Sequence, residues 1–260
     1  MAERTYLDAI LAWHRARASR DTRDVDALID AARECPPPRG FARAIATSPH
    51  LAVIAEIKRR SPSKGDLNAN LDPADMARRY QAGGASCLSV LTDENHFGGS
   101  VPDLQSARNA CDLPVIRKDF TVDVRDVCDA RIMGADCVLL IAAVLSRSEM
   151  VECLGVARDV GIDVLVEIHD EPELDIALDL GVELIGVNQR DLYTFAVDHE
   201  RALRMASVIP GDVVSVAESG IRGVDDARSL RSAGYDAVLV GEHLVTSGNP
   251  EGAVRELCIS

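Results

Sequence analysis

LAVIAEIK, residues 51–58, is the stretch that decides the fold of this 260-residue chain, because seven further runs repeat its pattern. Each run is short and mostly apolar, and it closes on glycine, polar or charged residues. Such runs are typical of parallel strands that are buried on both faces. The eight runs are Leu51–Lys58, Ala85–Thr92, Pro114–Asp119, Cys137–Ala143, Asp163–His169, Leu184–Arg190, Val213–Ser219 and Ala237–His243.

Helical patterns occupy the intervals between these runs. Several of them end at glycine, where a left-handed residue commonly caps a helix. Eight alternating strand and helix units predict a TIM (β/α)8 barrel, whereas a flavodoxin-like or Rossmann sheet rarely needs eight equal units. The predicted helices are Pro73–Gln81, Val124–Met133, Ser148–Asp159, Glu171–Asp179 and Val224–Ser232.

Length and composition favour one barrel domain over residues 1–260, with the barrel itself at 51–260. Hydrophobic residues make up 47% of the chain. No apolar run approaches the ~20 residues that a membrane span needs. The first residues, MAERTYLDAI, lack the basic and apolar blocks of a signal peptide. We therefore expect a cytoplasmic protein with no membrane partner.

Charge and cysteine content narrow the function further. The net charge of −14 argues against a nucleic-acid partner, but it permits a small anionic ligand in a local basic pocket. The seven cysteines are scattered and form no C-x-x-C pair. Cysteines scattered in this way are typical of small buried side chains in a protein that stays in a reducing compartment. We therefore expect neither disulfides nor a metal site.

Residues 1–50 form an extension before the first strand. It contains predicted helices at Tyr6–Ser19 and Val25–Arg33, a proline-rich break at 36–38, and a third helical piece around Phe41–Ala46. An extension of this kind either plugs the bottom of the barrel or folds over its top. The sequence leaves both positions open.

Charged side chains gather where the predicted strands end, which is where TIM barrels carry their chemistry. Residues i and i+2 of a strand share a face, so Glu56 accompanies Lys58 and Asn188 accompanies Arg190. Charges in apolar strands are costly to bury unless they are paired or functional. This rim predicts an active site composed of Glu56, Lys58, Arg117, Lys118, Asp119, Glu167, Asn188, Arg190, Glu218 and Ser219.

Three loops at the same rim suggest how a ligand is held. The glycine-bearing segments 218–223 and 241–244 match the loops that commonly bind phosphate through backbone N–H groups in this fold. Glu242 must then point away from the anion. The basic segment Arg59–Gly65 is predicted to be a lid that brings Lys58 and Ser61 onto the ligand, the alternative being an ordinary solvated loop.

The segment Val53–Gly65, VIAEIKRRSPSKG, resembles the signature of the indole-3-glycerol-phosphate synthase family of tryptophan biosynthesis. The resemblance covers essentially residues 50–250, and the helical extension is a further feature of that family. Further segments resemble the family in the same order, namely Ser89–Asp93, Arg117–Phe120, Leu165–Glu167, Gly186–Leu192 and Ala217–Ile221.

The resemblance implies a carboxy-lyase that uses no metal or cofactor. The family converts 1-(2-carboxyphenylamino)-1-deoxyribulose 5-phosphate to indole-3-glycerol phosphate, with loss of carbon dioxide and water. The ring carbon that bears the carboxylate attacks a polarised ketone, carbon dioxide leaves, and a hydroxyl is eliminated. This chemistry requires an ammonium acid, a carboxylate base, a cationic grip on the substrate carboxylate and a phosphate site.

Site roles follow from the same resemblance. Lys118 corresponds to the general acid that protonates the carbonyl, and Glu167 to the acid/base partner in the dehydration. Lys58 and Arg190 correspond to the residues that bind the substrate carboxylate, with Lys58 as an alternative proton donor. The remaining roles are orientation for Glu56, Asn188 and Glu218, a lid contact for Ser61, phosphate binding for Ser219, Gly220 and Gly241, and an aromatic slot for Ser89, Phe97, Phe120, Leu139 and Leu192.

Two positions depart from the family pattern. His96 stands where a second aromatic residue is common, and it is predicted to be a rim residue of the pocket and not a catalyst. Glu242 replaces a small hydroxyl residue beside the phosphate glycine. Neither change affects the core formed by Lys118, Glu167 and Lys58.

Two other classes of protein compete with this interpretation. A class I aldolase would form a Schiff base at Lys58 or Lys118, using an amine of depressed pKa. A binding barrel without activity would have lost its proton donors, but both lysines and all three carboxylates are present. The partner we expect is a phosphorylated small molecule, and the chain is expected to be a monomer or a weak homo-oligomer.

Overall fold

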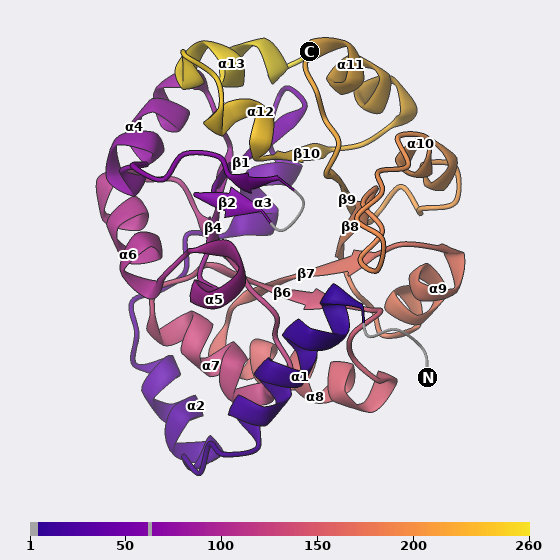
Figure 1. Ribbon diagram of the computed structural model, residues 1–260. Coiled ribbons are helices and arrows are strands. Elements are labelled where there is room, and N and C mark those ends of the chain that lie inside the picture. Colours follow the sequence, from indigo (N-terminus) through magenta and orange to yellow (C-terminus); the bar gives the residue numbers. More distant parts are fainter. Residues whose placement is uncertain (1–4, 62–63) are drawn as a thin grey trace.

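A computed structural model describes residues 5–61 and 64–260 of the chain. Eight parallel strands close into a barrel in the order β1-β10-β9-β8-β7-β6-β5-β4, and helices surround it (Figure 1). The predicted TIM barrel is confirmed, and every predicted run contains one barrel strand. The strands are β1 (Ala52–Ile57), β4 (Cys87–Leu91), β5 (Val115–Lys118), β6 (Cys137–Ile141), β7 (Asp163–Ile168), β8 (Leu184–Asn188), β9 (Val214–Glu218) and β10 (Ala237–Val240).

The outer helices begin and end where local chemistry directs. Ser146 caps the helix after β6 with a capping box, and Gly161 ends that helix in the left-handed conformation at φ 70°. At the helix that precedes β4, Asp72 accepts hydrogen bonds from the first backbone N–H groups, and Gly84 ends the helix in the left-handed conformation at φ 96°. The helices between and after the strands are α4 (Pro73–Gly83), α5 (Glu94–Phe97), α6 (Val101–Ala110), α7 (Val124–Ile132), α8 (Arg147–Val160), α9 (Glu171–Asp179), α10 (Arg201–Met205), α11 (Val224–Ala233), α12 (Glu242–Val245) and α13 (Pro250–Leu257).

Strand register brings the charged strand ends to one edge of the barrel. Leu91 pairs with Lys118, Ile141 with Glu167, and Asn188 with Glu218. All six residues of β1 are buried, as expected for a strand covered on both faces. The rim predicted from the separate runs is therefore continuous in space.

The extension occupies both of the positions that the sequence left open. Its helices are α1 (Tyr6–Ala18), α2 (Val25–Arg33) and α3 (Phe41–Ala46). Helix α3 plugs the N-terminal end of the barrel, where Phe41 and Ile45 are buried and the Ala42 N–H donates to Asp163 Oδ2 at 2.9 Å. Helix α1 lies at the opposite end, beyond the β4 and β5 termini, and α2 packs against α7 and α8 between them.

A short hairpin stands where the lid was predicted, formed by β2 (Arg60–Ser61) and β3 (Gly65–Asp66). Pro62 and Ser63, which belong to the predicted lid, lie outside the described residues. Arg59 forms an ion pair with Asp103 of α6, and Arg60 donates to the backbone carbonyl of His96 at 3.2 Å. The segment is thus tied to the loop and helices that follow β4.

In the described part of the chain, no helix has both the length and the apolar character that crossing a membrane requires. All seven cysteines are free thiols, and five of them are buried.

Candidate active site

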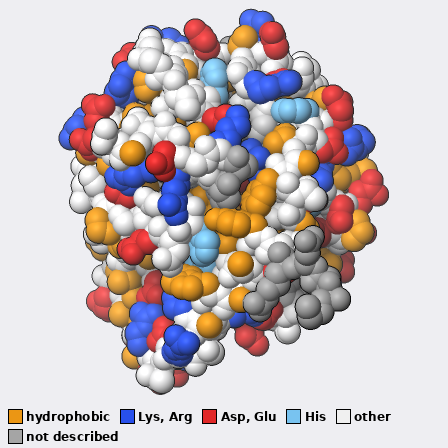
Figure 2. Space-filling view, in the orientation of Figure 1, with side chains coloured by type: hydrophobic (Ala, Val, Ile, Leu, Met, Phe, Trp, Pro, Cys, Tyr) orange, Lys and Arg blue, Asp and Glu red, His pale blue; other side chains and the backbone are white. Residues whose placement is uncertain are grey.

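A cavity of about 510 Å³ opens at the C-terminal ends of the barrel strands. Figure 2 shows this face, where hydrophobic side chains gather near the centre and charged side chains surround them. The lining comes from the ends of all eight barrel strands, the loops that follow them, and helix α1. The cavity therefore draws on segments from the whole length of the chain.

Lys118 lies at the centre of the charged part of this cavity. Its Nζ is 3.3 Å from Glu167 Oε2 and 3.9 Å from Glu218 Oε2. Asn188 Nδ2 donates to Glu167 Oε1 at 2.9 Å, which fixes the second oxygen of that carboxylate. These four side chains come from the ends of β5, β7, β8 and β9 and form one connected group.

Electrostatics keep Lys118 in its charged form. Burial alone lowers the pKa of the Lys118 ammonium, but the carboxylates of Glu167, Glu218 and Glu56 outweigh burial and raise the pKa above its ordinary value. A Schiff-base lysine needs the opposite shift, because only the neutral amine attacks a carbonyl. The environment of Lys118 therefore suits a proton donor.

The two carboxyl groups beside Lys118 are pushed apart in pKa. Burial raises the pKa of Glu167, but the charges of Lys118 and His169 and the hydrogen bond from Asn188 bring it below its ordinary value. Burial and the nearby Glu167 carboxylate raise the pKa of Glu218 well above its ordinary value. Two neighbouring carboxyls with divergent pKa values can serve as a base and an acid at the same pH.

Glycine makes room for the buried carboxyl of Glu218. A Cβ at Gly186 of β8 would lie 2.0 Å from Glu218 Oε1, so no other residue fits there without displacing the carboxyl. Glu218 Oε1 is itself buried and has no hydrogen-bond partner. Such an orphaned polar atom facing a cavity is costly to stability and is typical of a functional group that awaits a ligand.

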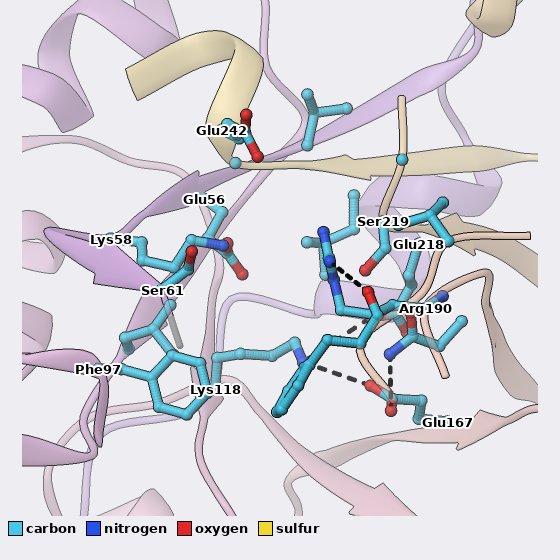
Figure 3. Close-up of a pocket in the computed structure, with 18 of the residues that line it drawn as sticks. Glu56, Lys58, Ser61, Phe97, Lys118, Glu167, Arg190, Glu218, Ser219 and Glu242 are labelled. Carbon is cyan, nitrogen blue, oxygen red and sulfur yellow. Dashed lines mark hydrogen bonds and ion pairs between the residues drawn. The ribbon is translucent and has the colours of Figure 1, made fainter. Parts of the chain in front are cut away.

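A second charged pair lies on the opposite wall. Lys58 Nζ forms an ion pair with Glu56 Oε1, and a Cβ at Gly241 would lie 2.3 Å from that same oxygen. Figure 3 shows this pair on one side of the cavity, with Glu167, Glu218 and Arg190 on the other and Lys118 below. Charged groups thus face each other across the space for a ligand.

The loop after β9 carries the conformation expected of a close backbone approach. Ser219 has φ 63° and Gly220 has φ 72°, and Ser219 is one of only two described non-glycine residues with positive φ. Gln189 Nε2 donates to the Ser219 carbonyl at 2.8 Å and holds this turn. Glu242 lies 2.5 Å from Lys64 Nζ of the hairpin, so its charge is paired.

Apolar side chains form the remaining wall. Phe97 follows β4 and Phe120 follows β5, and their ring centroids are 6.3 Å apart. Leu139 rises from β6, and Leu192 follows β8. Together with the hairpin residue Ser61, whose buried Oγ has no hydrogen-bond partner, they enclose a slot beside the charged groups.

All of the predicted site residues except Ser89 and Arg117 line this cavity. Arg117 is buried behind it and pairs with Asp119 and Asp126. Ser89 is fully buried in β4, and Leu91, two residues further on the same face, contacts the cavity in its place. Ser89 therefore lies one layer deeper in the barrel than predicted. His96, predicted to be a rim residue, is not among the lining residues; it contacts Asp93 and helix α1 instead.

Several lining residues were not predicted. Leu7 and Ile10 of α1 close the apolar side, and their i, i+3 spacing was a signal that this helix packs on something. Phe195, with φ 59°, accepts a hydrogen bond from Arg190 Nη1 at its carbonyl, at 3.0 Å. His199 also lines the cavity, close to Gly220. Positions in irregular loops give no such periodic signal.

Known proteins resemble the chain over nearly its full length. The family model described as "Indole-3-glycerol phosphate synthase" matches residues 7–257. "Indole-3-glycerol phosphate synthase 2" of Streptomyces coelicolor is 49% identical over 230 residues, which cover 88% of this chain and 89% of that protein. The "Indole-3-glycerol phosphate synthase" of Mycobacteroides abscessus is 45% identical over 258 residues, covering 99% and 95%.

A solved structure shows the fold alone. The crystal structure of a 3-hexulose-6-phosphate synthase has a TM-score of 0.64 and 14% sequence identity, and the match covers 81% of this chain and all of that one. The sequence relatives carry the functional information, and this structural neighbour adds only that the barrel architecture is shared.

Proposed function

Because the chain belongs to the indole-3-glycerol phosphate synthase family, we propose that its cavity carries out the ring closure of that family. The substrate is 1-(2-carboxyphenylamino)-1-deoxyribulose 5-phosphate, and the product is indole-3-glycerol phosphate. The single observation that carries the assignment of roles is the Lys118 ammonium, held between Glu167 and Glu218 at the mouth of an apolar slot.

The three chemical parts of the substrate match three parts of the cavity. The carboxyphenyl ring enters the slot of Phe97, Phe120, Leu139 and Leu192, and the phosphate binds the backbone at Ser219, Gly220 and Gly241. Lys58 and Arg190, on facing walls, bind the ring carboxylate between them. Ser61 contacts the ligand from the hairpin. Binding both ends of the substrate places the ketone over Lys118.

Condensation is the step assigned to Lys118. The ring carbon that bears the carboxylate forms a bond to the ketone carbon, and the carbonyl oxygen takes a proton from the Lys118 ammonium. The raised pKa of Lys118 ensures that this proton is present before the reaction. Carbon dioxide then leaves, and the electrons of its bond restore the aromatic ring.

Dehydration is the step assigned to Glu167. The hydroxyl on the former ketone carbon leaves as water, and the adjacent carbon beside the nitrogen loses a proton. Glu167 is ionised in the folded protein and accepts this proton, while Lys58 serves as a donor to the leaving hydroxyl. Glu56, Asn188 and Glu218 orient the three reacting side chains through the contacts described above.

Indole fluorescence provides the direct test. Purified protein is mixed with the carboxyphenylamino-deoxyribulose phosphate in the absence of added metal or cofactor, and Lys118→Ala is run alongside. We expect a rapid signal from the wild type and a loss on the order of 10²–10⁴-fold in kcat for the variant. A variant that changes KM alone would contradict the role of Lys118 as the acid.

Borohydride trapping separates this function from the aldolase. An aldolase of class I forms a Schiff base that borohydride reduces to a stable adduct with a ketose phosphate. We expect no adduct, because the carboxylates around Lys118 favour its charged form. An adduct that disappears in Lys118→Ala would overturn the proposal.

We also propose the setting of the enzyme: one domain, a cytoplasmic location, and a monomer or weak homo-oligomer with no nucleic-acid partner. The acidic composition supports the last point. Sedimentation at several protein concentrations tests the oligomeric state, since a stable dimer would show one mass throughout the range.

A further inference from the structure

Two histidines and an aspartate meet outside the catalytic cavity, where α1 crosses the loop after β4. His14 Nε2 is 3.0 Å from Asp93 Oδ2, and His96 Nδ1 is 2.8 Å from the same oxygen. His14 belongs to the extension, while Asp93 and His96 lie at the start of α5. One carboxylate oxygen therefore faces a ring nitrogen from each of two distant segments.

The geometry of this cluster suits a cation. One ligand atom from each residue can be chosen so that all three lie within 4.8 Å of one another. Ligands about 2.0–2.2 Å from a tetrahedral zinc ion are about 3.3–3.6 Å apart, so small side-chain movements admit an ion at their centre. Asp119 Oδ1, 3.8 Å from His14 Nε2, is a further oxygen within reach.

Burial distinguishes the cluster from an ordinary surface network. The side chains of His14 and Asp93 are 2% and 1% exposed, and that of His96 is 17% exposed. His14 Nδ1 is buried without a hydrogen-bond partner, so the contact at Nε2 alone compensates the burial of this ring. A bond to a metal at Nε2 offsets that burial more strongly than one hydrogen bond does.

The surrounding charges also favour a cation. Asp93 contacts only the two imidazoles and the α5 backbone, so no arginine or lysine shown by the structure neutralises it. Arg117 is paired with Asp119 at 3.0 Å and with Asp126, and Arg60 donates to the backbone carbonyl of His96 at 3.2 Å, so neither is paired with Asp93. The Asp93 carboxylate, with no lysine or arginine paired to it in the described residues, offers a negative charge for a divalent ion to balance.

We propose that His14, Asp93 and His96 bind a divalent cation of the zinc type, which joins the extension to the catalytic face of the barrel. Two imidazole nitrogens with a carboxylate favour zinc and its borderline neighbours over magnesium or calcium, which prefer all-oxygen sites. The sequence alone did not indicate a metal, because 79 residues separate His14 from Asp93.

The ion would fix one wall of the catalytic cavity. Leu7 and Ile10 lie on the same helix as His14, and Phe97 follows His96 directly. All three of these apolar residues line the cavity. His14, Asp93 and His96 are separate from the group of Lys118, Glu167, Asn188 and Glu218, so the ion would have a structural role and take no part in the reaction. Its loss should affect substrate binding more than kcat.

Zinc titration of the whole protein against a chromophoric chelator tests the proposal. We expect one zinc ion to bind per chain. His96→Gln should weaken zinc binding on the order of 100-fold, at least as much as losing a residue that only hydrogen-bonds a metal ligand. His50→Gln is the matched control, because His50 is exposed near the C-terminus and contacts Ser260. Equal zinc affinity in wild type and His96→Gln would overturn the site.

Two further measurements guard against other sources of binding. The titration is repeated with Cys35→Ser and Cys258→Ser, since these two thiols are the partly exposed ones; a stoichiometry that falls from one to zero would assign the ion to cysteine instead. Anomalous diffraction at the zinc edge, from crystals of unmodified protein, avoids variants that fail to fold. A peak between His14 and His96 supports the site, and a peak elsewhere only, or none, contradicts it.

Discussion

The two ends of the barrel differ in how fully their buried carboxyl groups are hydrogen-bonded. At the N-terminal end, Asp136 is fully buried and accepts hydrogen bonds from the Arg39 and Val115 backbone at 2.7 and 2.8 Å, in addition to an ion pair with Arg108. At the C-terminal end, Glu218 is as deeply buried, yet its Oε1 has no hydrogen-bond partner and its pKa is raised.

Backbone strain follows the same division. The two described residues other than glycine with positive φ, Phe195 and Ser219, both lie at the catalytic end. The opposite end is closed by helix α3, whose Phe41 and Ile45 are buried in the core. One end of the molecule therefore stabilises the barrel, and the other keeps polar groups poised at a cost to stability.

The largest expected effect breaks the catalytic end alone. Glu167→Gln keeps the shape of the side chain but removes the base, so kcat should fall on the order of 10²–10³-fold while the unfolding midpoint changes little. Indole fluorescence and urea unfolding measure the two quantities. Glu152→Gln, an exposed change on α8, serves as the control. A loss of activity below tenfold would show that Glu167 is dispensable in the dehydration.

At the N-terminal end of the barrel, Phe41→Ala should lower stability and leave kcat unchanged, the opposite of the result expected for Glu167→Gln. Removing this buried ring from α3 leaves a cavity and should cost about 3–5 kcal/mol in the free energy of unfolding. The kcat of the molecules that remain folded should stay near the wild-type value. Val208→Ala, at a side chain that is 42% exposed, is the control for stability. An equal fall in kcat would mean that the two ends are coupled.

Gly186→Ala sharpens the comparison within the catalytic end. The new methyl group would displace the Glu218 carboxyl from its place beside Lys118, and we expect kcat to fall roughly 10–100-fold, which corresponds to about 1.4–2.7 kcal/mol. Gly155→Ala in α8, where nothing lies within 4 Å of the added carbon, should stabilise the helix by about 0.5–1 kcal/mol and leave kcat unchanged. Equal activity in both variants would exclude a role for the position of Glu218.

The smallest effect concerns Glu218 and pH. The pKa of Glu218 is raised in the folded protein, so below the ordinary carboxyl pKa Glu218 is protonated in the folded and in the unfolded protein alike. Its full contribution to the free energy of unfolding is present there. That contribution is lost as pH rises through the folded-state pKa. Glu218→Gln should therefore match the wild type near pH 4 and exceed it by about 1–2 kcal/mol near pH 8.

Urea unfolding at the two pH values checks this prediction, with Glu152→Gln again as the reference. A variant that is destabilised equally at both pH values would indicate that Glu218 is ionised and paired with Lys118. The same variant should lose activity, so that stability and catalysis move in opposite directions at this one position.

The barrel was predictable because its strands are buried on both faces and read as nearly continuous apolar runs. Helices α5, α10 and α12 have only four or five residues, too few to show a helical period. Two longer helices were also missed although the sequence carries their signals. Helix α6 follows the N-cap Ser100 and has Leu104 and Ala107 buried, and in α13 Pro250, Ala253, Val254 and Leu257 share one buried face.

The charged residues of the candidate site could be brought together from the sequence because the ends of parallel strands meet at one edge. Ser89, which the family resemblance put in the aromatic slot, does not line the cavity, and the strand pattern could not have shown this because it gives the face of a residue but not its depth. The contribution of α1 to the cavity, and the meeting of His14 with Asp93, depend on contacts between distant segments. No local pattern reports such contacts.

Pairing between β1 and β10 has a consequence for how the chain is made. Residues 52–55 bond to residues 237–240, so the first barrel strand to leave the ribosome finds its neighbour on that side only when synthesis is nearly complete. His14 of helix α1 likewise can form its contacts only after Asp93 and Asp119 have been synthesised. Closure of the barrel is therefore among the last events of biogenesis, and until then the edge of β1 that faces β10 has no strand to pair with.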